Sequence, residues 1–143
     1  MANSNIFVVG LDEFHLAQLK ALRKAKNYRF HPLFHYEEIR GVAQFPVKVF
    51  LREAEKQLKA FPDPVDAIVG YWDFPVSTLL PILRTRLGLL SPTLESVLKC
   101  EHKYWSRLEQ LETIPDNVPC FTQVNPFAED PLATITLSYP FWL

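Results

Sequence analysis

Four chemically capable side chains follow one another in the middle of a helical pattern. Cys100, Glu101, His102 and Lys103 offer a thiol, a carboxylate, an imidazole and an ammonium group. Consecutive helical residues point in different directions, so these four cannot all face a core, and some must point to solvent or to another element. We therefore expect any chemistry of this chain to centre on this stretch.

One long helix is predicted to carry these side chains. Ser91 followed by Pro92 is typical of a helix start, because the hydroxyl can accept from a free amide and proline lacks the N–H that would be unpaired there. From that start, apolar residues recur every three or four positions, which predicts one uninterrupted amphipathic helix over residues 91–111. The apolar positions are Leu94, Val97, Leu98, Tyr104, Trp105, Leu108 and Leu111.

The preceding ninety residues alternate between short apolar runs and amphipathic stretches. The runs at residues 5–11, 28–34 and 65–72 are typical of buried strands, and Pro32 places the second of them near a sheet edge. Helical patterns follow Asp12, span residues 46–61 and follow Asp73, where each aspartate can cap its helix. This order predicts an α/β fold, with a parallel sheet covered by helices on both faces.

Three residues lie where such a sheet binds its ligands, at the carboxyl ends of strands. Gly10 could admit an anion, but Asp12 and Glu13 would repel a phosphate and no further glycines follow, so a plain turn glycine is the favoured interpretation. Trp72 and Asp73 end another strand. A ligand role and a purely structural role, as a packed indole and a helix cap, both explain them.

Composition excludes several classes of function. The chain carries 15 basic and 16 acidic residues, so it offers no basic field for nucleic acid. No apolar run is long enough for a membrane span, and the first residues do not form a signal peptide. Cys100 and Cys120 are expected to be free thiols in a reducing compartment, which favours the cytoplasm. The remaining histidines that we considered as ligands, His15, His31 and His35, fall on different elements, so no metal site is predicted.

The pattern changes after residue 112. A proline-punctuated linker leads to two predicted strands without a full-length helix between them, so we divide the chain into domains 1–112 and 113–143. Residues 135–143 are apolar and aromatic, and an exposed strand of this kind is an association hazard. We expect it to continue into more protein or to pair with another chain, which makes the sequence a fragment capable of self-association through this strand.

Short motifs from residue 88 to residue 119 occur in a characteristic order. They are Gly88-Leu89-Leu90-Ser91-Pro92, Glu95-Ser96-Val97, Cys100-Glu101-His102-Lys103, and Val118-Pro119 before a strand. This order resembles the pre-ATP-grasp region of ATP-grasp ligases, most closely the biotin carboxylase and carbamoyl phosphate synthetase group. Residues 139–143, YPFWL, resemble the strand that leads into a second ATP-binding lysine in that family.

The resemblance implies a Rossmann-like N-terminal domain followed by the first strands of an ATP-grasp unit. Lys103 then matches the family lysine that contacts ATP phosphates, and His102 replaces the Asp or Asn that commonly precedes it. The full-length protein would use ATP and Mg²⁺ to activate a carboxylate of a small-molecule substrate as an acyl phosphate. Magnesium ligands and the rest of the nucleotide site would lie in the downstream ATP-grasp domain, so this fragment would hold no catalytic residue, bind no cofactor tightly and be inactive alone.

A function of another class is also compatible with the alternating pattern. A non-catalytic receiver-like or flavodoxin-like module would bind a protein partner instead of ATP. Receiver domains need clustered acidic residues at the ends of strands. Asp12, Glu13 and Asp73 match that arrangement only in part. This alternative leaves the aromatic segment at residues 139–143 unexplained.

Overall fold

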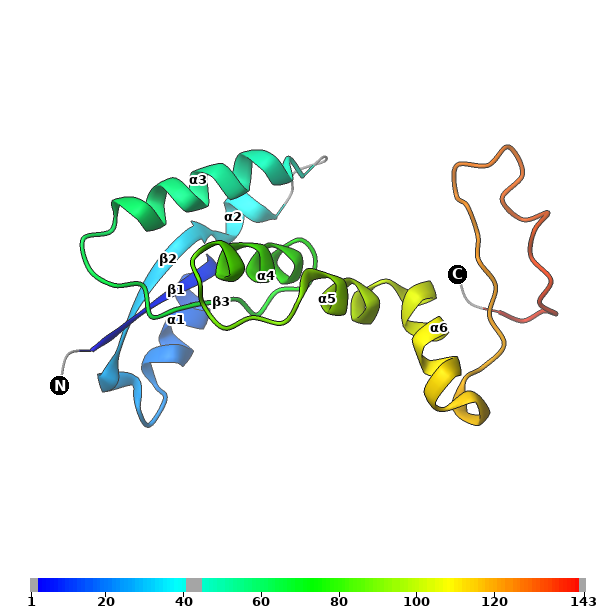
Figure 1. The fold of residues 1–143 in the computed structure, drawn as a ribbon, viewed down its shortest axis with the longest axis horizontal. Helices are drawn as coiled ribbons and strands as arrows, with labels where there is room; N and C mark the ends of the chain where they lie inside the picture. The colour runs from blue at the N-terminus through cyan, green and yellow to red at the C-terminus, as the bar shows by residue number, and fades with distance from the viewer. Residues whose placement is uncertain (1–2, 41–44, 142–143) are drawn as a thin grey trace. The chain divides into compact units, whose positions relative to one another are not determined.

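A computed structural model describes residues 3–40 and 45–141 of the chain (Figure 1). The chain divides into two compact units, residues 1–94 and residues 95–143. The first unit is a mixed α/β domain and holds the sheet, whereas the second is built from helices and extended chain. Gly41, in a stretch for which the sequence predicts a loop, lies outside the described residues.

Three parallel strands form the sheet of the first unit in the order β2-β1-β3. They are β1 (Ser4–Leu11), β2 (Tyr28–His35) and β3 (Ala67–Val69). The central strand β1 is the most apolar, as expected for a strand covered on both faces. Pro32 pairs in register with Val8 from the edge strand β2, where a residue without an N–H is tolerated. The predicted parallel α/β sheet is therefore confirmed.

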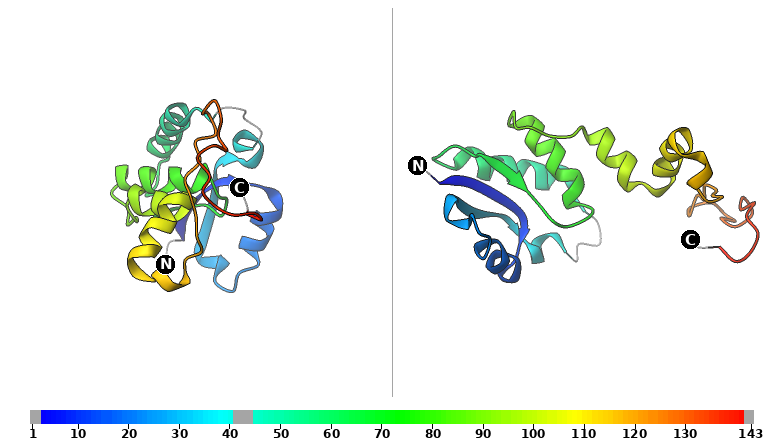
Figure 2. Two further views of the ribbon diagram at one scale, coloured as in Figure 1. Left: turned by 90° about the vertical axis from the view of Figure 1, so that its right-hand side faces the viewer. Right: turned by 90° about the horizontal axis from the view of Figure 1, so that it is seen from below.

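Helices cover both faces of this sheet. Figure 2 shows α1 (Glu13–Lys20) on one side, and α3 (Val47–Ala60) and α4 (Val76–Arg86) on the other. One helical turn, α2 (Tyr36–Ile39), follows β2, and the 3₁₀ turn η1 (Ala25–Asn27) precedes it. Gly88 follows the C-cap of α4, and its φ of 70° is the left-handed conformation that glycine adopts without strain.

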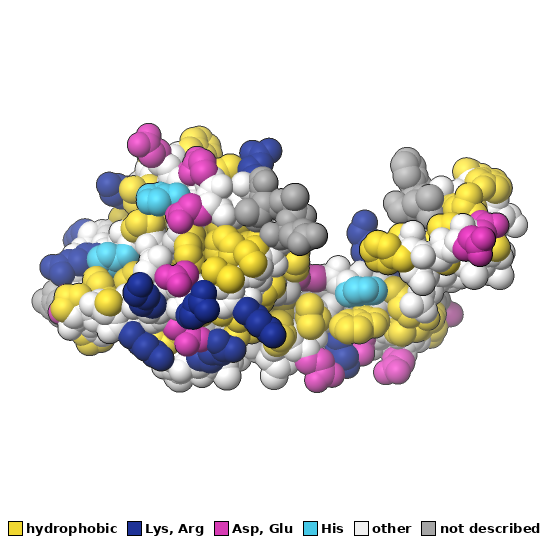
Figure 3. All heavy atoms as spheres, turned by 90° about the horizontal axis from the view of Figure 1, so that it is seen from above, with side chains coloured by type: hydrophobic (Ala, Val, Ile, Leu, Met, Phe, Trp, Pro, Cys, Tyr) yellow, Lys and Arg dark blue, Asp and Glu magenta, His cyan; other side chains and the backbone are white. Residues whose placement is uncertain are grey.

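The core lies between β1 and the helices α3 and α4. Its large, fully buried side chains are contributed by β1, β2, β3 and α4: Val9, Leu33, Ile68, Val76, Leu79 and Leu83. Each such aliphatic side chain contributes about 1.5–3 kcal/mol of burial free energy. On its solvent side α3 is charged, and Figure 3 shows basic and acidic side chains interspersed on that face of the unit.

The second unit begins with two helices where the sequence predicts one. These are α5 (Leu94–Glu101) and α6 (Lys103–Thr113), and the prediction of an uninterrupted helix is wrong. His102 has a ψ of 106°, which interrupts the helical backbone, and its Nδ1 accepts from the Trp105 amide at 3.4 Å as the N-cap of α6. Lys99 bonds Glu109 across the bend at 2.7 Å. In a straight helix these two residues would lie about 15 Å apart along the axis, so this ion pair exists only in the bent form.

The predicted C-terminal strands are also wrong within the described residues. After the 3₁₀ turn η2 (Pro115–Asn117), residues 118–141 contain turns and extended chain but no strand. Backbone hydrogen bonding explains this, because an extended segment becomes a strand only when its amides and carbonyls pair with a neighbour. Within residues 3–40 and 45–141, no helix has both the length and the apolar character needed to cross a membrane.

Candidate functional site

The carboxyl edge of the sheet brings together two of the predicted site residues. Tyr71 and Trp72, in the loop after β3, both donate to the carbonyl oxygen of Gly10, near the end of β1, at 2.9 and 3.0 Å. A carbonyl has two lone pairs, so these bonds use its full capacity. They fasten the loop after β3 to the turn between β1 and α1.

Glycine is required at position 10 for two reasons. Its φ is 71°, a conformation that side chains with a Cβ rarely adopt. A Cβ there would also lie 3.0 Å from Cδ1 of Trp72 and 3.3 Å from Cδ1 of Ile39. Gly10 therefore lets the indole approach the backbone closely enough to bond it.

Asp12 and His15 form a second fixed pair at the same edge. Asp12 caps α1 by accepting from the His15 amide at 2.7 Å, as the sequence predicts. Its two carboxylate oxygens also lie 2.7 and 2.8 Å from Nδ1 of the His15 ring. The bond from the His15 amide is the largest influence holding the pKa of Asp12 below its ordinary value. Because the carboxylate can only accept, Nδ1 is assigned as the protonated nitrogen.

Aromatic rings enclose this pair. The His15 ring stacks on Tyr71 with centroids 4.0 Å apart, and Trp72 meets it edge-on at 5.3 Å. Tyr36, just after β2, stacks on Trp72 at 4.4 Å. Burial is the main cause that raises the pKa of Tyr71, so its phenol is neutral at physiological pH. We call Asp12, His15, Tyr36, Tyr71 and Trp72 the edge cluster.

Asp73 lies next to the edge cluster but does not cap α4 with its side chain. The carboxylate accepts from the amide of Phe74 at 2.8 Å, and the helix N-cap is Pro75. The Asp73 backbone carbonyl does accept from the Val76 amide at 2.9 Å, so the residue closes the turn that enters the helix. Its carboxylate is exposed to solvent.

Lys103, the predicted phosphate contact, is the first residue of α6 and is exposed. Among the residues that the structure describes, no acidic side chain lies within ion-pair distance of its ammonium group. The first amides of a helix lack intrahelical partners, so Lys103 combines a positive charge with a helix end that favours anions. Cys100 and Cys120 are both free and exposed.

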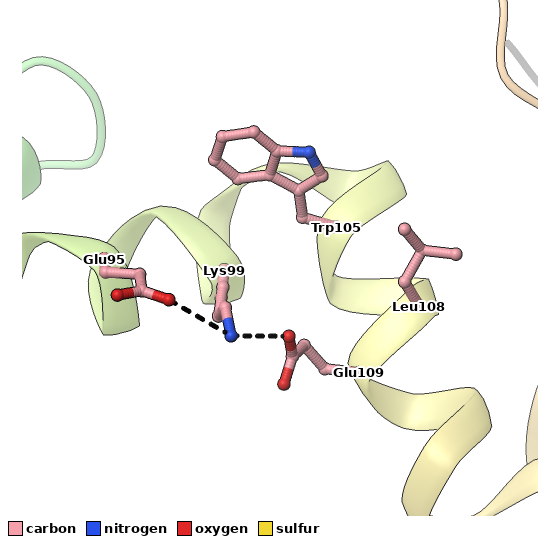
Figure 4. Close-up of a pocket in the computed structure, with 5 residues that line it drawn as sticks. All are labelled: Glu95, Lys99, Trp105, Leu108 and Glu109. Atoms are coloured by element: carbon pink, nitrogen blue, oxygen red, sulfur yellow. Dashed lines mark ion pairs between the residues drawn. The ribbon is translucent and has the colours of Figure 1, made fainter.

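The bend between α5 and α6 encloses a hollow of about 270 Å³ in the second unit (Figure 4). Trp105 and Leu108 form its apolar wall. Lys99 also lines it, 3.3 Å from Glu95 and 2.7 Å from Glu109, and these two carboxylates raise the pKa of Lys99, Glu109 more strongly. Lys99 is the only cation among the described residues that line this hollow, and both of its ion pairs are with carboxylates there. The hollow therefore offers no unpaired positive charge to a phosphate.

The edge cluster contains residues that sequence reasoning missed. The sequence predicts a satisfied or solvated His15 and a helix cap at Asp12; the structure satisfies the His15 ring through Asp12, which also caps α1, and adds Tyr71 beside them. Their positions at or just after the ends of predicted strands, in GLDEFH and GYWDF, are the available signal. Within the described parts of the chain, no group of three His, Cys, Asp or Glu side chains could hold a metal ion.

Comparison of the chain with protein-family models, with curated proteins and with solved structures finds no match.

Proposed function

We propose that this chain is the N-terminal part of a cytoplasmic ATP-grasp ligase that activates a carboxylate with ATP as an acyl phosphate. In this proposal the first unit is the Rossmann-like pre-ATP-grasp domain. A small-molecule substrate binds at the carboxyl edge of its sheet, beside the edge cluster and Asp73, and buried Gly10 supports that edge by accepting from Tyr71 and Trp72. Lys103 contacts the phosphates of ATP.

The observation that carries the proposal is the position of Lys103. An ammonium group is a compact cation suited to phosphate oxygens, and placement at the start of α6 adds the positive end of the helix dipole. No described acidic side chain pairs with it, so phosphate binding would break no ion pair. The bend at His102 makes Lys103 the first residue of a helix. In one straight helix over residues 91–111, Lys103 would lie in the middle, away from either helix end.

The residues of this chain fit ATP better than they fit magnesium. Lys103 suits a phosphate, whereas the described residues include no group that could hold a metal ion. Mg²⁺ would therefore be held by carboxylates of the downstream ATP-grasp domain. The exposed aromatic residues Phe127 and Tyr139, 94% and 80% accessible, would pack within that domain or against a second chain.

The affinity of the full polypeptide for MgATP tests this proposal. Charge-assisted hydrogen bonds are each worth about 1.5–3 kcal/mol, so Lys103→Gln should weaken binding of MgATP by about 10- to 100-fold. Isothermal titration calorimetry measures this directly. Lys56→Gln is the matched control, because Lys56 is an exposed helical lysine on α3.

Two results would contradict the proposal. One is a full polypeptide that does not bind MgATP, and the other is a Lys103→Gln variant that binds it as tightly as the wild type. The 143-residue chain alone should neither hydrolyse ATP nor bind it at micromolar concentration, because the proposed magnesium ligands and second lysine are missing from it.

A further inference from the structure

One surface of the first unit is basic, although the formal net charge of the whole chain is only -1. Residues 14–36 contain five basic side chains and no acidic one. All five are exposed, and they follow the chain from the last residue of α1 through η1 to the start of β2. We call them the basic cluster: Lys20, Arg23, Lys24, Lys26 and Arg29.

Carboxylates do not neutralise the basic cluster. Among the residues that the structure describes, none of its five side chains forms an ion pair, whereas Glu55 on α3 pairs with both Lys59 and Arg86. Asp66 immediately precedes β3, two strand spacings, or about 10 Å, from β2. That separation is about one Debye length at physiological ionic strength. The five positive charges therefore act together as one local field, which the balanced charge of the whole chain conceals.

Apolar side chains are exposed among these charges. Leu22, between Lys20 and Arg23, is 54% exposed, and Tyr28, next to Arg29, is 37% exposed. Phosphates of a nucleic acid or carboxylates of an acidic peptide would use the cations but gain nothing from an exposed leucine. A lipid bilayer offers an anionic headgroup layer to the cations and an apolar layer beneath it to the leucine, and tyrosine rings suit the boundary between the two. The combination favours a membrane surface.

We propose that the basic cluster docks the first unit on an anionic lipid bilayer. The cations lie among the headgroups, Leu22 enters the boundary with the acyl chains, and the Tyr28 ring lies at headgroup level. The carboxyl edge of the sheet lies at the other end of the eight-residue strand β2, about 25 Å away, so docking leaves that edge clear of the lipid. The inference uses only the first unit and does not depend on ATP binding.

Binding of the 143-residue chain to vesicles tests this inference. The vesicles contain two parts phosphatidylcholine to one part phosphatidylserine, and co-sedimentation at low ionic strength gives the partition coefficient. Each basic side chain near such a surface contributes about fivefold to this coefficient. The triple variant Lys20→Gln, Arg23→Gln and Lys24→Gln should therefore lower it by about 100-fold.

A triple variant on α3 is the matched control. Lys48→Gln, Arg52→Gln and Lys56→Gln removes the same three charges from exposed positions on the opposite face of the sheet (Figure 2). The acidic residues Glu53 and Glu55 lie among these positions, so the local field is weak and the partition coefficient should stay unchanged.

Leu22→Ala distinguishes a bilayer from other polyanions. This change should lower the partition coefficient by about 5- to 10-fold, because the leucine side chain leaves water when it enters the bilayer. Binding to heparin, a soluble polyanion, depends on charge and should not change. If Leu22→Ala binds the vesicles as tightly as the wild type, the basic cluster is a site for an acidic macromolecule and the membrane inference is wrong.

Two further outcomes would overturn the inference. One is a wild type that binds the mixed vesicles no better than vesicles of phosphatidylcholine alone, and the other is an equal loss of binding in the two triple variants. Far-ultraviolet circular dichroism checks that each variant is folded. If the changes at the end of α1 disturb that helix, Lys26→Gln with Arg29→Gln replaces them and should lower the partition coefficient by about 25-fold.

Discussion

Replacing Gly10 with alanine would test whether the carboxyl edge is held together as the structure indicates. Forcing a residue with a Cβ into the left-handed region costs about 1–2 kcal/mol. The new methyl group would also lie 3.0 Å from Cδ1 and 3.4 Å from Nε1 of Trp72, so the indole must move and its bond to the Gly10 carbonyl weakens. Loss of that bond adds about 0.5–1.5 kcal/mol. We therefore expect Gly10→Ala to lower the free energy of unfolding by about 1.5–3.5 kcal/mol, the sum of these two contributions.

Gly88→Ala is the matched control for this measurement. Gly88 has nearly the same φ, 70°, but a Cβ there would meet nothing within 4 Å. Gly88→Ala should therefore lower the free energy of unfolding only by the cost of the left-handed backbone, about 1–2 kcal/mol. Urea unfolding followed by far-ultraviolet circular dichroism gives both values, with an unchanged m-value as the check that the unfolding reaction is the same.

The difference between the two glycine variants isolates the contact with Trp72. If Gly10→Ala and Gly88→Ala cost the same, the indole does not press against Gly10 and our account of the edge cluster is wrong. Trp72→Phe provides a second check, because it removes the indole N–H and keeps an aromatic ring. It should cost about 1 kcal/mol, the value of one hydrogen bond.

Three further measurements test the first unit. Gly70→Ala places a methyl group against Cγ1 of buried Val76, and such overpacking should destabilise by about 1–3 kcal/mol in urea unfolding; a neutral result would mean that the loop after β3 shifts freely. Leu79→Ala opens a cavity beside α4 and should cost about 2–5 kcal/mol, whereas the same change at Leu22, which is 54% exposed, should cost far less. The lowered pKa of Asp12 stabilises the fold above its ordinary value of 3.8, and this stabilisation is lost as the pH falls through the lower folded value. The stability of Asp12→Asn should therefore approach that of the wild type only below that value, and a difference that persists unchanged at lower pH would contradict the lowered pKa of Asp12.

Most of the first unit could be predicted from local patterns. The apolar run of β1 indicated a strand covered on both faces, and Pro32 indicated an edge strand. Asp12 and Gly88 marked the start of one helix and the end of another. Each of these signals is a property of a few consecutive residues, such as a missing N–H, a side-chain acceptor or a tolerated φ, so no distant contact is needed to recognise it.

The second unit shows where local patterns fail. Apolar periodicity continues through His102, so the pattern gave no sign of the bend. The bend lies at the extended backbone of His102 and brings Lys99 to Glu109, an ion pair between residues ten positions apart. The segment at residues 135–141 has the composition of a strand, but a strand needs a paired neighbour, and the described residues supply none.

The candidate sites also combine features that the sequence predicts with features that only the tertiary structure shows. Sequence alone determined the residue types, the parallel α/β class and the positions of Gly10, Trp72 and Asp73 at strand ends, because strand order brings those ends to one edge. Only the tertiary structure decided that Tyr71 and Trp72 share one carbonyl, that His15 is fixed by Asp12 and Tyr71, and that Lys103 begins a helix. The contacts at the sheet edge join residues up to 62 positions apart in the chain, and packing of the unit sets the distances between them.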